Sequence, residues 1–198
     1  MQLLLALPLF SFVGSITPGP NNIMIMSSGL NFGIKKSLPH AFGIFLGFLV
    51  MFLLTGIGLG KLFIQFPEFH QSLKIIGGIY MLYLAYKIAR SHVNVDNLAP
   101  LKPLTFLQAF LFQWVNPKAW VIRMSAIAAY TVPDANIFYQ VSLICLVFMV
   151  AGILPSVVVW LFFGASLKKI LKTPAHRKYF NYTMSALLIV SIALIFLK

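Results

Sequence analysis

Six long apolar runs dominate the sequence, and they constrain the fold more than any other feature. A helix that crosses the hydrocarbon core of a bilayer needs about 20 mostly apolar residues. Runs of this kind cover residues 3–30, 41–65, 72–90, 104–131, 137–167 and 179–197. Apolar residues make up 60% of the 198-residue chain and charged residues only 9%, a balance that a soluble domain cannot accommodate. The sequence therefore predicts an all-α membrane protein with six transmembrane helices.

The positions of the basic residues predict how these helices are oriented. Fifteen Lys and Arg residues oppose three acidic ones, which gives a formal net charge of +12. Ten of the fifteen lie in the gaps after the first, third and fifth runs or at the edge of those gaps: Lys35, Lys36, Lys87, Arg90, Lys102, Lys168, Lys169, Lys172, Arg177 and Lys178. Because cytoplasmic loops are enriched in Lys and Arg, we expect these gaps to be cytoplasmic and both termini periplasmic. This placement indicates a lipid bilayer, not a nucleic acid, as the partner of the positive charge.

The chain divides into two halves of three runs each. A polar connector at residues 94–103, predicted to be cytoplasmic, joins residues 1–93 to residues 104–198. An odd number of helices per half places the halves in opposite orientations, which permits two inverted three-helix repeats. The first run lacks the cationic start and the cleavage pattern of a signal peptide, so we expect it to be retained.

Two of the runs contain residues that interrupt a helix. The string S-I-T-P-G-P-N-N occupies residues 15–22 of the first run, and N-P-K occupies residues 116–118 of the fourth. Both lie near the middle of the bilayer, because roughly twelve to sixteen helical residues precede each one at about 1.5 Å per residue. Thr17 is a favourable N-cap, and Pro18 and Pro20 fit the first turn of a new half-helix. Asn116 and Pro117 repeat this pattern, so we expect broken first and fourth helices.

The paired breaks predict a binding site. The N-terminus of a half-helix offers free N–H groups and a positive dipole end to an anion such as a carboxylate. Because unwound backbone is tolerated in a membrane only beside protein or water, we expect both breaks to line a cavity. The alternative is that both are simple kinks, in which neighbouring Thr and Asn side chains satisfy the freed carbonyls. Two breaks at corresponding positions of opposed halves favour the binding site.

Several motifs resemble those of one transporter family. These motifs are T-P-G-P-N at residues 17–21, Gly43 and Gly47 in the second run, K-I-I-G-G-I-Y-M-L-Y-L-A-Y-K at residues 74–87, and N-P-K-A-W at residues 116–120. Together they resemble the LysE/RhtB family of bacterial inner-membrane amino-acid exporters over practically the whole chain. The resemblance implies a secondary transporter that exports amino acids or close derivatives, six helices in inverted repeats and coupling to protons. T-P-G-P-N-N, with Thr105 and Phe106 ahead of Gln113, resembles members that handle small neutral or sulfur-containing amino acids.

The resemblance assigns a substrate-lining role to the motif residues of both breaks. We add polar neighbours, because with no acidic residue in the runs the substrate's ammonium group must rely on carbonyls and amides. The predicted substrate-binding residues are Thr17, Pro18, Gly19, Pro20, Asn21, Asn22, Gln113, Asn116, Pro117 and Lys118.

Lys118 and Arg123 are cations within the fourth run, where a charge is costly unless it is paired or hydrated. A substrate carboxylate is a suitable partner for Lys118, and the alternative is a lysine that snorkels or contacts carbonyl groups at the first break. Arg123 stands where members of the family usually continue with apolar residues, about 7 to 8 Å further along the helix axis. It either lines the cavity, where it favours a more anionic substrate, or snorkels outward.

Two further residues are candidates for coupling or gating. The acidic residues Glu68, Asp96 and Asp134 all fall in predicted loops, so His40, at the cytoplasmic mouth of the second run, is the titratable candidate for a proton carrier. The alternative for His40 is a solvated histidine at the membrane interface. Pro155 in the fifth run is either a moving gate or a structural kink.

Other functional classes lack supporting motifs. The single Cys145 provides no disulfide framework and no metal spacing, and nothing in the chain resembles a nucleotide-binding loop or a hydrolase nucleophile. We therefore expect no enzymatic activity, no cofactor and no metal. The alternatives to an exporter are a non-transporting membrane scaffold with the same fold, or a channel. Gly43 and Gly47 allow close helix packing, either within one chain or across a homodimer.

Overall fold

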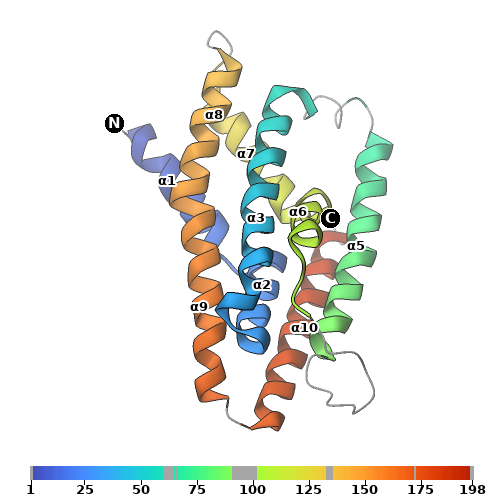
Figure 1. Ribbon diagram of the computed structural model, residues 1–198. Coiled ribbons are helices and arrows are strands. Elements are labelled where there is room, and N and C mark those ends of the chain that lie inside the picture. Colours follow the sequence, from blue (N-terminus) through green and yellow to red (C-terminus); the bar gives the residue numbers. More distant parts are fainter. Residues whose placement is uncertain are drawn as a thin grey trace.

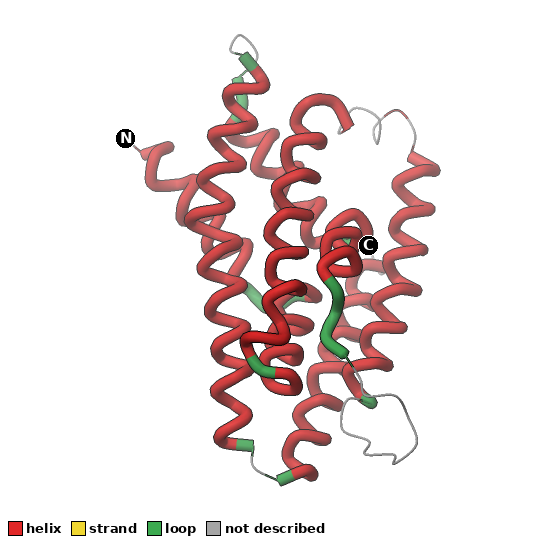
Figure 2. Tube along the Cα trace, viewed as in Figure 1, coloured by secondary structure: helices red, strands yellow, loops and turns green. Residues whose placement is uncertain are grey.

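The computed structural model of the protein describes residues 2–59, 65, 67–90, 102–132, 136–171 and 173–196. These residues are helical apart from short connections, and none of them belongs to a strand. The helices form an elongated bundle (Figure 1), and Figure 2 shows how few residues lie between them. The predicted all-α class is confirmed.

The helical elements follow the predicted runs. In chain order they are α1 (Gln2–Ile16), α2 (Pro20–Phe32), α3 (Ile34–Leu54), the π-helical η1 (Thr55–Leu59), α5 (Pro67–Ala89), α6 (Phe106–Val115), α7 (Pro117–Tyr130), α8 (Ile137–Val147), the π-helical η2 (Phe148–Ile153), α9 (Leu154–Ile170) and α10 (Pro174–Phe196). Two stretches of the described chain are long and apolar enough to cross a membrane unaided, Ile34–Leu54 and Ile137–Leu167.

Three helices begin earlier than the apolar runs predict. The first residue is 34 instead of 41 for α3, 67 instead of 72 for α5, and 174 instead of 179 for α10. In each case the first turns are polar, and hydropathy does not detect a helix end that lies in water. Only Gly33, with a φ of 80°, separates α2 from α3. Lys35 and Lys36 therefore lie in the first turn of α3 and not in a loop.

The connections that are rich in basic residues lie at one end of the bundle. In Figure 1 the starts of α3 and α10 and the ends of α5 and α9 lie in the lower part of the bundle. We call this the basic end, and its described basic residues include Lys35, Lys36, Lys87, Arg90 and Lys102. Most of the connector predicted at residues 94–103 falls outside the described residues, as do Asp96 and Asp134, so the division of the chain into two halves stays a prediction.

Helices from the two predicted halves pack against one another. α2 packs against α9, α3 against α6, α5 against α10, and α1 against η2. Glycines permit the closest of these contacts, since a Cβ on Gly43 would lie 2.4 Å from the carbonyl oxygen of Phe106, and one on Gly47 would lie 2.6 Å from that of Phe110. The close packing predicted for Gly43 and Gly47 therefore occurs within one chain.

The outer surface of the bundle is apolar. Large hydrophobic side chains such as Phe42, Ile79, Leu146 and Phe163 are at least half exposed, whereas the interior contains a cluster around Phe48, Phe52 and Phe148. Exposed apolar side chains distributed in this way around a soluble protein would promote aggregation. Such a surface is typical of a protein that lies in a lipid bilayer.

Candidate functional site

Both predicted interruptions are present in the structure. α1 ends at Ile16 and α2 begins at Pro20, with Gly19 in an extended conformation at the N-cap position. Asn116, with φ −86° and ψ 105°, separates α6 from α7, and Pro117 is the first residue of α7. Figure 2 shows the first break as a short loop well inside the bundle. Proline ends a helix here because it cannot donate the N–H that the preceding helix would need.

The prediction that Thr17 is the N-cap and Pro18 a first-turn residue of the new half-helix is wrong. The hydroxyl group of Thr17 donates to the carbonyl oxygen of Gly14 at 3.1 Å, and its backbone N–H donates to that of Val13. Thr17 therefore completes the last turn of α1. Gly19 occupies the cap position without a side-chain bond, which leaves the first N–H groups of α2 free of capping groups.

Residues of the two breaks line one cavity, which we call the central cavity. Its polar lining residues are Ser15, Asn21, Asn22, Asn116, Lys118 and Ser156. Five of the ten predicted substrate-binding residues line it, namely Gly19, Asn21, Asn22, Asn116 and Lys118. The other five lie beside these residues along the chain or, like Gln113, contact one of them. No acidic residue is among the described residues that line this cavity.

Lys118 joins the start of α7 to the first break. Its ammonium group donates to the hydroxyl oxygen of Thr17 at 2.8 Å, and also to the carbonyl oxygens of Thr17 and Pro18. A Cβ on Gly19 would lie 2.8 Å from Cδ of Lys118, so a larger residue at this position would require the lysine side chain to shift. Sequence analysis offered two partners for Lys118, a substrate carboxylate or carbonyl groups of the first break, and the structure shows the contact with the carbonyl groups. Lys118 also lines the central cavity.

Two amides form a second bridge between the breaks. The side chain of Asn21 donates to Oε1 of Gln113 at 2.8 Å, and the amide of Gln113 donates back to Oδ1 of Asn21 at 3.1 Å. Gln113 is fully buried and also donates to the carbonyl oxygen of Ala109. This reciprocal pair fixes α2 relative to α6.

The carbonyl groups freed at the end of α1 are satisfied by side chains. Asn22 donates to the carbonyl oxygens of Ser15 and Thr17, at 2.7 and 2.9 Å. Ser156 also donates to Ser15, and the indole N–H of Trp160 donates to the carbonyl oxygen of Ile16 at 3.0 Å. Sequence analysis missed Ser156 and Trp160, although Gly152, Ser156 and Trp160 recur every four residues and so share one face of a helix.

Two buried acceptors in the central cavity have no partner. These are Oδ1 of Asn116 and Oγ of Ser15, both shielded from water. A buried polar group without a hydrogen bond is unfavourable by about 1–3 kcal/mol. The residues that carry these two acceptors line the same cavity as Lys118.

Arg123 neither lines the central cavity nor snorkels outward, so both expectations for this residue are wrong. The guanidinium group is fully buried, 4.9 Å from the ring centroid of Phe48 and 5.4 Å from that of Trp120, and its nitrogens make no hydrogen bond. Five residues of α-helix rotate the side chain by about 140° beyond a full turn, which points Arg123 away from Lys118.

His40 and Pro155 lie away from the breaks. His40 is 1% exposed, so the alternative of a solvated interfacial histidine is wrong. Because α3 begins at Ile34, His40 lies in its second turn, inside the bundle and not at its edge. Pro155 is in the first turn of α9, directly after η2. A π-helical segment accommodates the missing N–H of a proline, so we see a structural reason for Pro155 at this position.

A helical bundle with an apolar outer surface and a polar cavity at two broken helices is the architecture of an integral membrane transport protein. The chain belongs to the LysE type translocator family, whose family model matches residues 12–198. Translocators of this family are transporters and not enzymes.

Relatives named as efflux proteins match about two thirds of the chain. A cysteine/O-acetylserine efflux protein of Salmonella choleraesuis (strain SC-B67) is 35% identical over 136 residues, which are 68% of this chain and 69% of the relative. The protein of the same name from Escherichia coli (strain K12) is 34% identical over 128 residues, which are 64% of this chain and 65% of the relative. No solved structure matches the sequence.

Proposed function

We propose that the protein exports a small neutral amino acid or a close derivative, of the cysteine and O-acetylserine class, across the bacterial inner membrane. The relatives described above are named for efflux of these two compounds. The single observation that carries the proposal is the central cavity, in which Lys118 and the first turns of two half-helices meet. The ten substrate-binding residues predicted from the sequence are part of this proposal.

The cavity offers separate partners for the two charges of an amino acid. Lys118 and the uncapped N–H groups at the start of α2 are donors for the carboxylate, and a helix N-terminus carries a partial positive charge. Asn116 Oδ1 and Ser15 Oγ are unpaired acceptors for the ammonium group. With no acidic residue among the described lining residues, the cavity suits a neutral side chain better than a basic one.

Alternating access of the two halves is the transport mechanism in this proposal. In support, the first helix of each predicted repeat packs against the second helix of the other repeat. The first helix of the first repeat (α1 and α2) contacts η2 and α9, and the first helix of the second repeat (α6) contacts α3. The third helices of the two repeats, α5 and α10, pack against each other. Exchange of partners of this kind is what two inverted repeats would produce. The basic end is then cytoplasmic and both termini are periplasmic.

The proposal includes coupling to protons, which the resemblance to the exporter family implies. Proteoliposomes with an imposed pH gradient test this part. Acidification on the side opposite the basic end should drive accumulation of labelled O-acetylserine on that side, and a protonophore should abolish it. If the accumulation of labelled O-acetylserine were the same with and without the pH gradient, transport would not be coupled to protons.

Counterflow in proteoliposomes tests the function itself. Vesicles loaded with unlabelled O-acetylserine or cysteine should take up the labelled compound faster than empty vesicles, and lysine loading should have no effect. A scaffold would show no uptake, and a channel would show uptake without acceleration by internal substrate. Lys118→Gln should abolish counterflow, whereas Lys35→Gln, which removes an exposed lysine at the basic end, should leave it unchanged.

A further inference from the structure

Part of the lining of the central cavity is apolar. Phe48, from α3, has the largest of the apolar side chains that line it. A substrate that the polar residues hold by its two charges must place its own side chain against this apolar lining. We call the large apolar residues of the lining the apolar wall, and they are Ile44, Phe48, Ile122, Ile153 and Val157.

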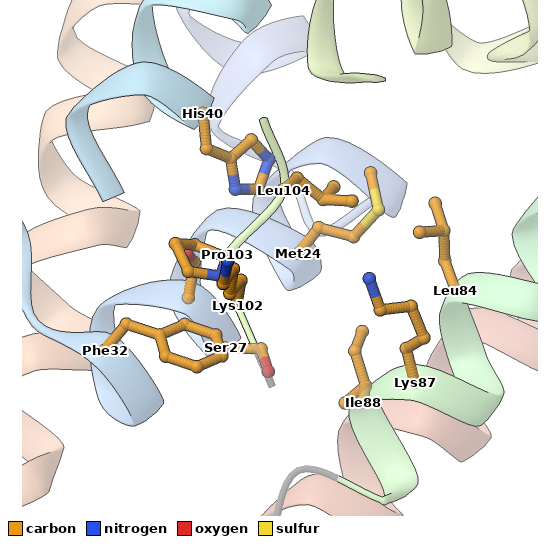
Figure 3. A pocket seen from close by; sticks show the side chains of 11 residues that line it. Met24, Ser27, Phe32, His40, Leu84, Lys87, Ile88, Lys102, Pro103 and Leu104 are labelled. Carbon is orange, nitrogen blue, oxygen red and sulfur yellow. The ribbon is translucent and has the colours of Figure 1, made fainter. Parts of the chain in front are cut away.

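The face of α3 that contributes to the apolar wall also reaches a second cavity. His40, Ile44 and Phe48 follow one another at intervals of four residues, so they share one face of the helix. Figure 3 shows His40 at the second cavity, near Leu104. Phe48 is eight residues further along α3, about 12 Å along the axis, and lines the central cavity. The position of its ring therefore affects the shape of the central cavity and not of the second one.

The ring of Phe48 lies against the guanidinium group of Arg123. The central carbon of this group is 4.9 Å from the ring centroid of Phe48 and 5.4 Å from that of Trp120. The indole N–H of Trp120 donates to the carbonyl oxygen of Trp114 at 2.7 Å, two residues before the second break at Asn116. Because a guanidinium group is attracted to the faces of aromatic rings, Arg123 joins a ring of the apolar wall to the second break.

Arg123 acts on the central cavity only through its neighbours. Ala119 and Ile122 of the same helix line the cavity, whereas Arg123 is not among the described residues that do. The guanidinium group is fully buried, and its nitrogens have no hydrogen-bond partner among the described residues. Removing such a cation from water is unfavourable, so stability alone does not favour an arginine here. Its contact with Phe48, a residue of the cavity lining, is a functional reason for it.

We propose that Arg123 is a positioning residue, which fixes the ring of Phe48 and thereby limits the size of the substrate side chain that the central cavity admits. Phe52 and Phe148 also lie near this ring, at 5.8 and 6.1 Å between centroids, but only Arg123 brings a charge to it. A fixed wall admits the narrow side chains of cysteine and O-acetylserine and excludes an aromatic ring. The identity of the ligand as an amino acid rests on the function proposed above, whereas the restraint on Phe48 does not.

A fluorine reporter in the apolar wall tests the restraint. The full chain, with 4-fluorophenylalanine in place of Phe48, is placed in phosphatidylcholine nanodiscs and observed by ¹⁹F NMR without ligand. The reporter should give one narrow resonance beside Arg123. Arg123→Met should broaden or split it, because methionine fills a similar volume with a flexible chain. Arg90→Met is the matched control, since Arg90 also lies over an aromatic ring, that of Tyr86, but is exposed at the end of α5.

Ligand titrations test the effect on selectivity. O-acetylserine should shift the ¹⁹F resonance saturably, and free phenylalanine should bind roughly tenfold or more weakly, because size alone discriminates by roughly 10- to 200-fold. Arg123→Met should reduce this ratio to about threefold or less by tightening the binding of phenylalanine. If Arg123→Met does not fold, Arg123→Lys, which keeps the charge without the planar group, replaces it with the same expectation.

A double-variant cycle tests whether Arg123 acts through Phe48. Ligand-induced stabilisation of the unlabelled protein gives the same selectivity ratio. Phe48→Leu should reduce the ratio, and Arg123→Met combined with Phe48→Leu should reduce it no further, because both changes act on one ring.

Three outcomes would overturn the proposal. They are an unchanged ligand-free spectrum in Arg123→Met, equal broadening in Arg90→Met, and additive effects of Arg123→Met and Phe48→Leu on selectivity, which would mean that Arg123 acts by another route. Failure of the proposed function has a different signature. If no amino acid shifts the resonance but the ligand-free spectra differ as expected, the proposed function fails and the restraint of the cavity wall by Arg123 stands.

Discussion

The ammonium group of Lys118 lies 2.8 Å from the hydroxyl oxygen of Thr17, 101 residues away in the sequence. The contact joins the first turn of α7 to the last turn of α1, where carbonyl groups carry the negative end of the helix dipole. These carbonyls compensate the charge of Lys118. A substrate carboxylate competes with them for the same cation, so binding and the geometry of the first break are coupled.

Lys118→Gln should therefore weaken substrate binding more than it changes stability. A hydrogen bond to a charged group contributes about 1.5–3 kcal/mol, which corresponds to roughly a 10- to 150-fold rise in Kd for O-acetylserine. The measurement is ligand-induced stabilisation in detergent, because a ligand that binds the folded state raises the unfolding midpoint. Lys35→Gln serves as the control. An unchanged response in Lys118→Gln would show that the carboxylate binds elsewhere.

The Asn21–Gln113 pair should behave as one energetic unit. Asn21→Ala or Gln113→Ala leaves the partner amide without its reciprocal bonds, and a buried polar group in that state costs about 1–3 kcal/mol. The double variant should lose less than the sum of the two, with a coupling of about 0.5–3 kcal/mol in unfolding free energy. Gln71→Ala, at an exposed position of α5, is the neutral control. Strict additivity would mean that the pair does not bind α2 to α6.

Glycine packing provides a prediction about stability alone. A Cβ on Gly164 would lie 2.0 Å from the backbone carbonyl oxygen of Met26, where α9 crosses α2, so Gly164→Ala must separate the two helices. We expect a loss of about 1–3 kcal/mol, the usual effect of overpacking. Gly14→Ala is the matched control, because its Cβ would lie 3.5 Å from Ile122, an ordinary contact. Thermal unfolding in detergent measures both, and equal midpoints would contradict the close α2–α9 crossing.

The sequence predicts the breaks well because proline acts locally. Pro20 and Pro117 each occupy the first position of a new half-helix, where the missing N–H is tolerated, and the small surface of Gly43 permits close packing whatever its neighbour is. The ends of α3, α5 and α10 are predicted less well, because the hydropathy of a run does not report on polar turns that extend into water. The early start of α3 in turn explains why His40 is buried, although the apolar run places it at the membrane interface.

Side-chain partners across the bundle could not be predicted from one sequence. Thr17 has the residue type of an N-cap, but the cation that it meets comes from Lys118, and only the packing of α7 against α1 brings the two together. Ser156 and Trp160 contact the first break for the same reason. Arg123 shows the limit most clearly, since nothing near it in the sequence indicates that Phe48 and Trp120 lie on either side of its guanidinium group.

The burial of Arg123 leads to the last prediction. Two aromatic rings contribute about 2 kcal/mol each to a desolvated cation, but removing the charge from water costs several kcal/mol and its N–H groups make no hydrogen bonds. Arg123→Met should therefore keep or raise the unfolding free energy, by up to about 4 kcal/mol. Arg123→Ala should be about 2–5 kcal/mol less stable than Arg123→Met, because it leaves a hole between Phe48 and Trp120. Chemical unfolding of both variants measures the difference. If Arg123→Met proved markedly less stable than the wild type, the buried cation would have a partner in the folded protein, and its isolation between the two rings would be disproved.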